Sequence, residues 1–274
     1  MKIFGIRPGL TLCLLAVLAS CGKEKATDSH RDYVENALGL KLDMVYVEGG
    51  SFAMGATEEQ GEDALDNEKP VRTVRLDSYY IGRFEITQGQ WEKVMGSTVR
   101  DQWAVADIDF GISEEGDAFP MYYITWEEAV AFCEKLSELT GRHYVLPTEA
   151  QWEYAARGGR KAQPTKYSGS DILDEVGWYY TENTKRLQLV GGKSSNELGI
   201  YDMSGNVWEY CADYYDMYDP SQTDNPTGAE TSPCRVSRGG SWADVASHCR
   251  VSYRATPLPN FRLLNLGFRV AMIP

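Results

Sequence analysis

Short apolar segments separated by Gly, Asn, Asp and Pro dominate the chain from Lys41 to Pro274. This pattern predicts short strands and sparse regular structure. Five segments are predicted as strands: Met44–Val47, Val71–Leu76, Tyr79–Ile81, Arg235–Arg238 and Gly267–Met272. Seven Trp and seventeen Tyr residues supply large apolar area, which suits a loop-rich fold that cannot rely on long ladders.

Three segments begin with a Thr whose side chain can cap the first turn of a helix. In each, the side chain of a Glu or Gln three residues later can reach back to the backbone N–H of the Thr. They are Thr87–Gln90, Thr125–Glu128 and Thr148–Gln151. Helices are predicted from these caps to the glycines that can end them, which are Gly96, Gly141 and Gly158. Residues 97–118 show no periodicity and are interpreted as a surface insertion.

The N-terminal segment has the layout of a secretory signal, with Lys2 and Arg7 around the start of an apolar run. The run is too short to span a bilayer. It ends in a match to the bacterial lipobox, made by Leu18, Ala19, Ser20 and Cys21. Residues 1–20 are therefore predicted to be the signal and Cys21 the lipidated first residue of the mature protein. The alternative is an ordinary cleaved signal that ends in a cysteine by chance.

Residues 21–40 are polar and charged without sustained periodicity, so they are predicted to be a flexible tether. No linker rich in Pro, Gly or Ser divides residues 41–274, which are predicted to form one domain. Acyl chains on Cys21 would hold the protein to one leaflet. The predicted location is the bacterial cell envelope, at the outer membrane. The formal net charge of −13 excludes nucleic acid as an expected partner.

Six stretches of the domain carry recognisable motifs. They are Met44–Gly55, Tyr80–Thr87, Leu146–Gly159, Gly199–Tyr210, Arg238–Trp242 and Leu266–Arg269. In this order, and over essentially all of residues 41–274, they resemble the formylglycine-generating enzyme (sulfatase-modifying factor) family. The resemblance implies the α+β, C-type-lectin-like fold of that family, with sparse regular secondary structure. Because fold alone does not establish function, the family chemistry is compared residue by residue.

Oxidases of this family convert a cysteine of a sulfatase peptide to formylglycine with molecular oxygen, through copper(I) held by two thiolates. Ungapped alignment of the segment Gly239–Cys249 puts these two ligands at Asp244 and Cys249. A carboxylate is a hard oxygen ligand, so copper is not expected to bind, and Cys249 is catalytic only if the site is active. A metal site made of Asp244, His248 and Cys249 is the alternative. Trp208, Ser241 and Asp244 are assigned to a binding cleft.

The resemblance also implies a structural calcium site. Side-chain oxygens of Asp202 and Glu209 and backbone carbonyls of Gly205 and Val207 would be its ligands. Calcium prefers several hard oxygens in flexible geometry, and two carboxylates would offset its charge. In the alternative reading, Asp202 caps a turn and Glu209 pairs with an arginine.

The disulfides of the animal enzymes do not transfer to this chain, because the partner position expected for Cys133 holds Val270. Cys133 is predicted to be a buried thiol on its helix. Cys211 and Cys234 are then the remaining pair, and they are predicted to form a disulfide that closes the loop between them.

The leading hypothesis is a non-catalytic lipoprotein of the cell envelope that presents a cleft to a protein or peptide partner, or to a glycan. The alternative is a formylglycine-generating oxidase that acts on sulfatase or related cysteine peptides through Cys249, alone or with a further metal. A third hypothesis is a non-catalytic accessory of an exported sulfatase.

Overall fold

The folded domain of the computed structural model begins at Arg31, ahead of the predicted boundary at Lys41. The structure describes residues 1, 5, 31–106 and 108–274; the predicted lipidation site Cys21, and nearly all of the predicted signal and the tether up to residue 30, lie outside them. Strand β1 (Tyr33–Glu35) pairs with β2 (Leu42–Val47), and the Tyr33 ring packs 5.1 Å from Tyr80. The prediction that the tether extends to residue 40 was therefore wrong.

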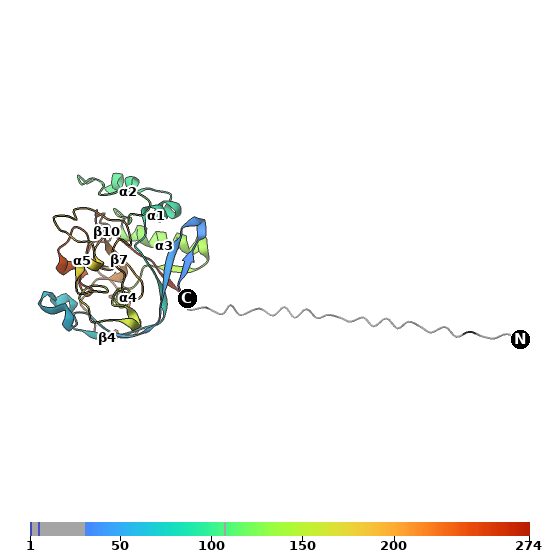
Figure 1. The fold of residues 1–274 in the computed structure, drawn as a ribbon, viewed down its shortest axis with the longest axis horizontal. Coiled ribbons are helices and arrows are strands. Elements are labelled where there is room, and N and C mark those ends of the chain that lie inside the picture. Colours follow the sequence, from blue (N-terminus) through green and yellow to red (C-terminus); the bar gives the residue numbers. More distant parts are fainter. Residues whose placement is uncertain (2–4, 6–30, 107) are drawn as a thin grey trace. The chain divides into compact units, whose positions relative to one another are not determined.

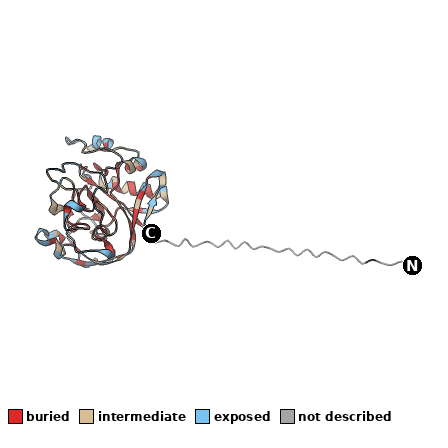
Figure 2. Cartoon of the chain, viewed as in Figure 1, coloured by how far each residue is buried: buried red, intermediate tan, exposed pale blue. Residues whose placement is uncertain are grey.

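The largest sheet has five antiparallel strands in the order β1, β2, β5, β11, β6. Besides β1 and β2, its strands are β5 (Tyr79–Gly82), β11 (Ala271–Ile273) and β6 (His143–Val145). Strand β11 lies between β5 and β6, so it connects β6 to the rest of the sheet. All four residues of β5 are buried. Figure 2 shows buried residues in the interior of the domain and exposed residues on its outer elements.

A second sheet has the order β10, β7, β8, β9, and a third consists of two strands. Their bounds are β10 (Leu266–Gly267), β7 (Trp208–Tyr214), β8 (Arg235–Arg238), β9 (Arg254–Ala255), β3 (Gly50–Met54) and β4 (Arg72–Leu76). The single strand predicted over Gly267–Met272 is wrong, because β10 and β11 belong to different sheets. Phe268 and Val270 lie between these two strands. Their carbonyls accept hydrogen bonds from the backbone N–H groups of Ile86 and Gly82.

The three predicted capping boxes are confirmed at the starts of the main helices. These helices are α1 (Gln88–Met95), α3 (Trp126–Thr140) and α4 (Glu149–Ala156). Gly96 and Gly141 end α1 and α3 in the left-handed conformation. Trp91 of α1 stacks on Phe132 of α3 at 5.7 Å, and the two helices lie side by side in Figure 1.

The segment 97–118 contains a helix that the sequence interpretation missed, α2 (Val99–Ala106). Thr98 and Asp101 cap it reciprocally, because each backbone N–H donates to the other side chain. The remaining helical pieces are short: α5 (Leu173–Val176) and the 3₁₀ turns Ala37–Gly39, Glu58–Asp63, Asp66–Glu68, Gly159–Lys161 and Ala246–Cys249. The architecture is α+β, as predicted. Within the described ranges, every helix lacks the length and apolar character needed to cross a bilayer.

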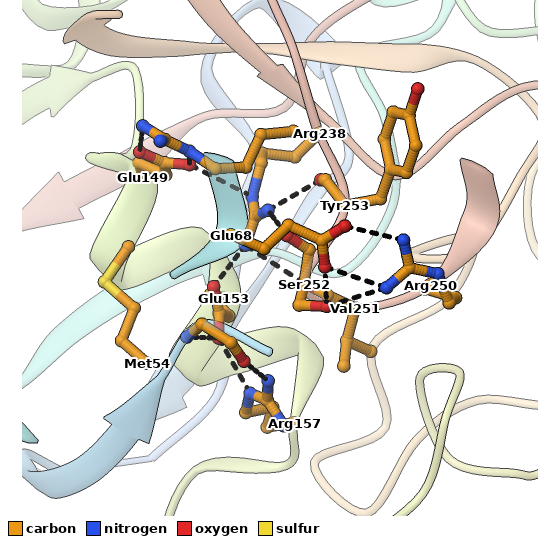
Figure 3. A network of polar contacts seen from close by, with 12 residues as sticks. Met54, Glu68, Glu149, Glu153, Arg157, Arg238, Arg250, Val251, Ser252 and Tyr253 are labelled. Atoms are coloured by element: carbon orange, nitrogen blue, oxygen red, sulfur yellow. Dashed lines mark hydrogen bonds and ion pairs between the residues drawn. The ribbon is translucent and has the colours of Figure 1, made fainter. Parts of the chain in front are cut away.

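Buried arginines hold the loops to the helices and strands (Figure 3). Arg238 at the end of β8 contacts the Glu153 carboxylate of α4. Its guanidinium also donates to the carbonyls of Val251, Ser252 and Tyr253, at 3.0, 2.6 and 2.6 Å. One side chain thus binds a helix and three consecutive backbone groups of a segment without regular structure.

Two further arginines repeat this arrangement with paired hydrogen bonds. Arg250 donates to both oxygens of Glu68, at 2.8 and 2.6 Å. Arg254 donates to both oxygens of Glu149 at the start of α4, at 2.6 and 2.8 Å. Such two-point pairs set orientation as well as distance. They therefore fix the path of residues 250–254 across the domain.

Replacing Glu153 with Gln should lower the free energy of unfolding by about 3–5 kcal/mol, because it removes the buried carboxylate that pairs with both Arg238 and Arg157. Urea denaturation followed by circular dichroism measures the change. The matched control is Glu48→Gln, which breaks the exposed Glu48–Arg160 pair and should change stability by less than about 1 kcal/mol. Equal effects of the two substitutions would contradict a structural role for the buried Glu153 carboxylate.

Candidate functional site

A tight turn after β8 carries two of the three residues assigned to the cleft, Ser241 and Asp244, and the third, Trp208, begins β7. Gly239 and Gly240 have φ of +97° and +72°, a region that residues with a Cβ rarely enter. A Cβ on Gly240 would lie 2.6 Å from Cys249 Sγ. The turn therefore depends on glycine, and it places Ser241 and Asp244 beside the start of β7.

The Asp244 carboxylate is bound by three side chains. Trp208 Nε1 donates to Oδ2 at 2.8 Å, and Ser241 Oγ donates to the same oxygen. His248 Nδ1 lies 3.0 Å from Oδ1, within hydrogen-bond distance. Asn265 Nδ2 donates to Ser241 Oγ at 2.9 Å. The structure thus brings the predicted Trp208, Ser241 and Asp244 together and adds His248 and Asn265.

Aromatic rings form one wall of this cluster. The ring centroids of His248 and Tyr253 are 4.5 Å apart, and those of Trp208 and Tyr253 are 5.8 Å apart. The His248 side chain is 36 % exposed, so part of it is accessible to an outside partner. Tyr180 and Val245 are more than half exposed beside Asp244, and the Tyr180 N–H donates to the Asp244 carbonyl. The cluster offers ring surfaces, apolar side chains and hydrogen-bonding groups to a ligand.

Cys249 lies behind the turn and is fully buried. Burial, with a further contribution from Asp244, raises the pKa of its thiol. A thiol rather than a thiolate is therefore the stable form near neutral pH, whereas metal binding requires the thiolate. Within residues 31–106 and 108–274, no three Asp, Glu, His or Cys side chains gather as a metal-binding group. The alternative metal site of Asp244, His248 and Cys249 is not formed.

The segment predicted to bind calcium forms a turn at its glycine. Asp202, Gly205 and Asn206 all have positive φ, and a Cβ on Gly205 would meet Trp178 O at 2.1 Å. This geometry carries Asp202 and Glu209 towards the same buried guanidinium, that of Arg269.

Glu209 is paired with Arg269. Arg269 Nε and Nη2 donate to Glu209 Oε2 and Oε1, at 2.6 and 2.7 Å, and Trp152 Nε1 donates to Oε2 at 2.7 Å. The alternative reading, in which Glu209 pairs with an arginine, is therefore observed. The positive charge that the sequence interpretation assigned to calcium is supplied at Glu209 by Arg269.

Asp202 differs from Glu209 because one of its oxygens is unpaired. Oδ2 accepts from the Gly191 N–H at 2.6 Å, but Oδ1 is buried without a hydrogen-bond partner among the described residues. Burial raises the pKa of Asp202 to about 6. Nearby Glu85, also buried, accepts from Asn206 Nδ2 and the Val207 N–H. A cation bound at this point would pair with the unsatisfied Oδ1. Calcium binding at Asp202 therefore stays a prediction.

The sequence interpretation did not assign Glu85 or Arg269 to this cluster. Both lie in motifs that it quoted, Tyr80–Thr87 and Leu266–Arg269, so the signal was present. Their pairing depends on contacts between segments far apart in the chain, which a single sequence does not show.

The predicted disulfide between Cys211 and Cys234 is not formed: each cysteine in the described ranges is a free thiol. Cys211 lies beside Tyr210, which pairs with Ser237, whereas the Cys234 carbonyl accepts from the N–H of Tyr215. The two cysteines are therefore displaced along the strands, and a disulfide tolerates only about 7 Å between Cα atoms. Cys133 is a buried thiol on α3, as predicted.

The chain is similar in sequence and fold to known proteins. Residues 30–273 match the family described as the sulfatase-modifying factor enzyme 1-like domain. The chaperone protein LppX of Paenibacillus barcinonensis is 31 % identical, with 77 % of this chain and 82 % of LppX covered. The formylglycine-generating enzyme of Thermomonospora curvata is 29 % identical, with 84 % and 93 % covered. The solved structure of Treponema denticola variable protein 1 superposes with a TM-score of 0.75, at 26 % identity, with 89 % and 99 % covered.

Calcium should raise the thermal midpoint of the protein, because the ion would pair the buried Asp202 Oδ1. The gain is on the order of 2.7 kcal/mol when free calcium is a hundredfold above its dissociation constant, and a chelator should reverse it. Differential scanning calorimetry with calcium and with chelator measures the response.

Two variants separate calcium binding from the ion pair. Asp202→Asn should abolish the response to calcium, whereas Glu209→Gln should lower the midpoint with or without calcium because it unpairs Arg269. A wild-type midpoint that does not respond to calcium would show that this segment only shapes the fold.

Proposed function

Because the chain belongs to the sulfatase-modifying factor enzyme 1-like domain family, we propose that it is a lipoprotein that binds a protein or peptide partner without oxidase chemistry. The observation that carries this proposal is the environment of Asp244. In the family resemblance, this position holds a copper-binding thiolate. Here it holds a carboxylate bound by Trp208, Ser241 and His248, so copper(I) would lack the second of its two thiolates.

The state of Cys249 supports the same conclusion. Its thiol is buried under the Gly240 turn, and its raised pKa disfavours the thiolate. An oxidase that relied on this cysteine alone would need the buried group to become exposed and deprotonated. Formylglycine-generating oxidase activity is therefore the second candidate function. The similarity to enzymes of that name is the observation that favours it.

Binding is the activity that the surface around Asp244 supports. Tyr253 and His248 provide ring faces, and Val245 and Tyr180 provide exposed apolar contacts. Such a mixture suits a polypeptide, which offers both side chains and backbone donors. The name of the LppX relative, a chaperone protein, favours a polypeptide client over a glycan.

The proposal includes a lipid anchor at Cys21 and a place in the bacterial cell envelope, at the outer membrane. It rests on the lipobox match and the short apolar run before it. Nucleic acid is not part of the proposal, because the chain carries a formal net charge of −13.

The wild-type protein should form no aldehyde on a sulfatase-type cysteine peptide supplied with copper(I) and oxygen, because it lacks the second thiolate. Mass spectrometry of the peptide measures the product. The informative variant is Asp244→Cys, which restores two cysteines to the segment Gly239–Cys249; binding of copper(I) by this variant but not by the wild type is expected. Aldehyde formed by the wild type and lost in Cys249→Ala would establish the oxidase instead.

Partner binding is tested in the anchored protein with a photo-crosslinking residue at Val245, beside Asp244. We expect it to trap a discrete polypeptide in the membrane fraction. The same residue at Val71, which is exposed elsewhere on the domain, should trap none. Cys21→Ala should release the protein from the membrane fraction. Equal crosslinking at Val71 and Val245 would contradict a partner site at the cluster, and unchanged membrane retention of Cys21→Ala would contradict the anchor.

A further inference from the structure

The two-stranded sheet of β3 and β4 is covered on one edge and open on the other. On the outer edge of β4, the Arg75 N–H donates to the Thr223 carbonyl at 2.7 Å, and the Arg75 carbonyl accepts from the Asn225 N–H at 2.8 Å. Ser51 of β3 is the cross-strand partner of Arg75, and Ala53 follows two residues later. Because residue pairs with and without hydrogen bonds alternate along an antiparallel ladder, the backbone groups of Ser51 and Ala53 point away from β4.

Side chains occupy both ends of the β3 edge. Arg160 Nε donates to the Gly49 carbonyl at 2.8 Å. At the other end, Arg157 Nη2 donates to the Gly55 carbonyl at 2.7 Å, and the Gly55 N–H donates to Glu153 Oε1 at 2.9 Å. The outward-facing backbone groups on either side of Ser51 and Ala53 are thus satisfied within the domain.

The stretch between these ends is a free strand edge. Ser51 and Ala53 are exposed, and their backbone N–H and C=O groups have no hydrogen-bond partner among the described residues. Free edges pair readily with another strand, and proteins usually block them. The edge of β6 has such a block, because Ser137 Oγ accepts from the Tyr144 N–H at 2.9 Å. The edge of β3 is therefore able to accept a further strand.

The free edge lines a cavity of about 360 Å³. Phe52 and Tyr154 of α4 belong to the lining, and their ring centroids are 5.1 Å apart. The loop that follows α4 supplies Ala162, Gln163 and Pro164. The two charged residues of the lining, Glu59 and Arg157, are paired with each other at 2.7 Å. The cavity therefore suits an uncharged ligand with an apolar part.

We propose that the free edge of β3 binds an extended, uncharged polypeptide segment as a third strand of this sheet. A polypeptide main chain offers N–H and C=O groups at the spacing of the edge. In an antiparallel arrangement, the two residues of the segment opposite Ser51 and Ala53 would each donate and accept a hydrogen bond. The cavity shares no residue with the Asp244 cluster, so this inference goes beyond the partner binding proposed there.

The residue between these two determines how well the segment fits. It would lie opposite Phe52, and directly opposite residues share a face of a sheet. Its side chain would therefore lie on the face of β3 where Phe52 packs on Tyr154. We expect an aromatic or aliphatic side chain at this position, because burial of apolar area is favourable and the charges of the lining are already paired.

Fluorescence anisotropy of a dye-labelled pentapeptide tests the proposal with the full protein in detergent. The probe is Thr-Val-Phe-Val-Thr with blocked ends, so that its two Val residues lie opposite Ser51 and Ala53. It should bind saturably. The same peptide with both Val nitrogens methylated keeps the side chains but loses the donors, and it should bind at least tenfold more weakly. Equal binding of the two peptides, or no binding of the unmodified one, would overturn the proposal.

Variants assign the binding to this edge. Ala53→Pro removes an outward N–H that β4 does not use and should weaken binding at least tenfold, whereas Ala53→Val keeps the N–H and should leave the affinity within twofold. Gln163→Trp fills the cavity from its exposed loop and leaves the edge intact, so it decides the question if Ala53→Pro does not fold. Wild-type affinity in Gln163→Trp would refute the site.

Hydrogen exchange shows whether the peptide pairs with the backbone. The amide hydrogens of Ser51 and Ala53 should exchange at least tenfold more slowly when the pentapeptide is bound, and unchanged exchange at both would contradict strand addition. Sedimentation without peptide tests a second copy of the chain as the occupant. A dimer that Ala53→Pro abolishes would show that the edge pairs with another β3 and would overturn the proposal.

Discussion

The Arg238 guanidinium binds the Glu153 carboxylate and three consecutive carbonyls of residues 251–253, and the arrangement of the domain around it depends on this contact. The strands are short, so ladders of backbone hydrogen bonds align only a small part of the chain. Buried arginines take over that task, because a planar guanidinium has five donors and can hold loop carbonyls and a carboxylate in one geometry. Such pairs carry a desolvation penalty, and their value here is in specifying one loop path rather than in adding net stability.

The same clamps position the Asp244 cluster. Its turn starts directly after Arg238 and ends just before Arg250, and each of these arginines is anchored by a buried glutamate, Glu153 or Glu68. Residues between two such fixed points can change without disturbing the framework. This explains how a position assigned to a metal-binding thiolate in the family resemblance can hold a carboxylate. Both oxygens of the Asp244 carboxylate are paired, by Trp208 of β7 and by Ser241 and His248 of the turn.

A further cluster of buried charge surrounds Arg269. It holds three carboxyl groups, those of Glu85, Asp202 and Glu209, and Glu209 is paired with the guanidinium. Burial raises the pKa of Glu85 and of Asp202, which reduces the negative charge that these two groups carry. Asp202 Oδ1 is left without a hydrogen-bond partner among the described residues. Because buried polar groups in native proteins are almost always satisfied, this atom is one place where a small ion is expected to act.

The sequence by itself determined the local features and the family. The helix starts at Thr87, Thr125 and Thr148 depend on residues three positions apart, and the motif order depends only on the chain. The tertiary structure decided the rest: that β1 joins the sheet, that residues 268–270 separate two sheets, and that Cys211 and Cys234 stay free. It also decided that Glu209 faces Arg269, a residue 60 positions away. The physical reason is that charge pairing and strand order depend on which distant segments meet, and many arrangements satisfy the same local pattern until the core selects one of them.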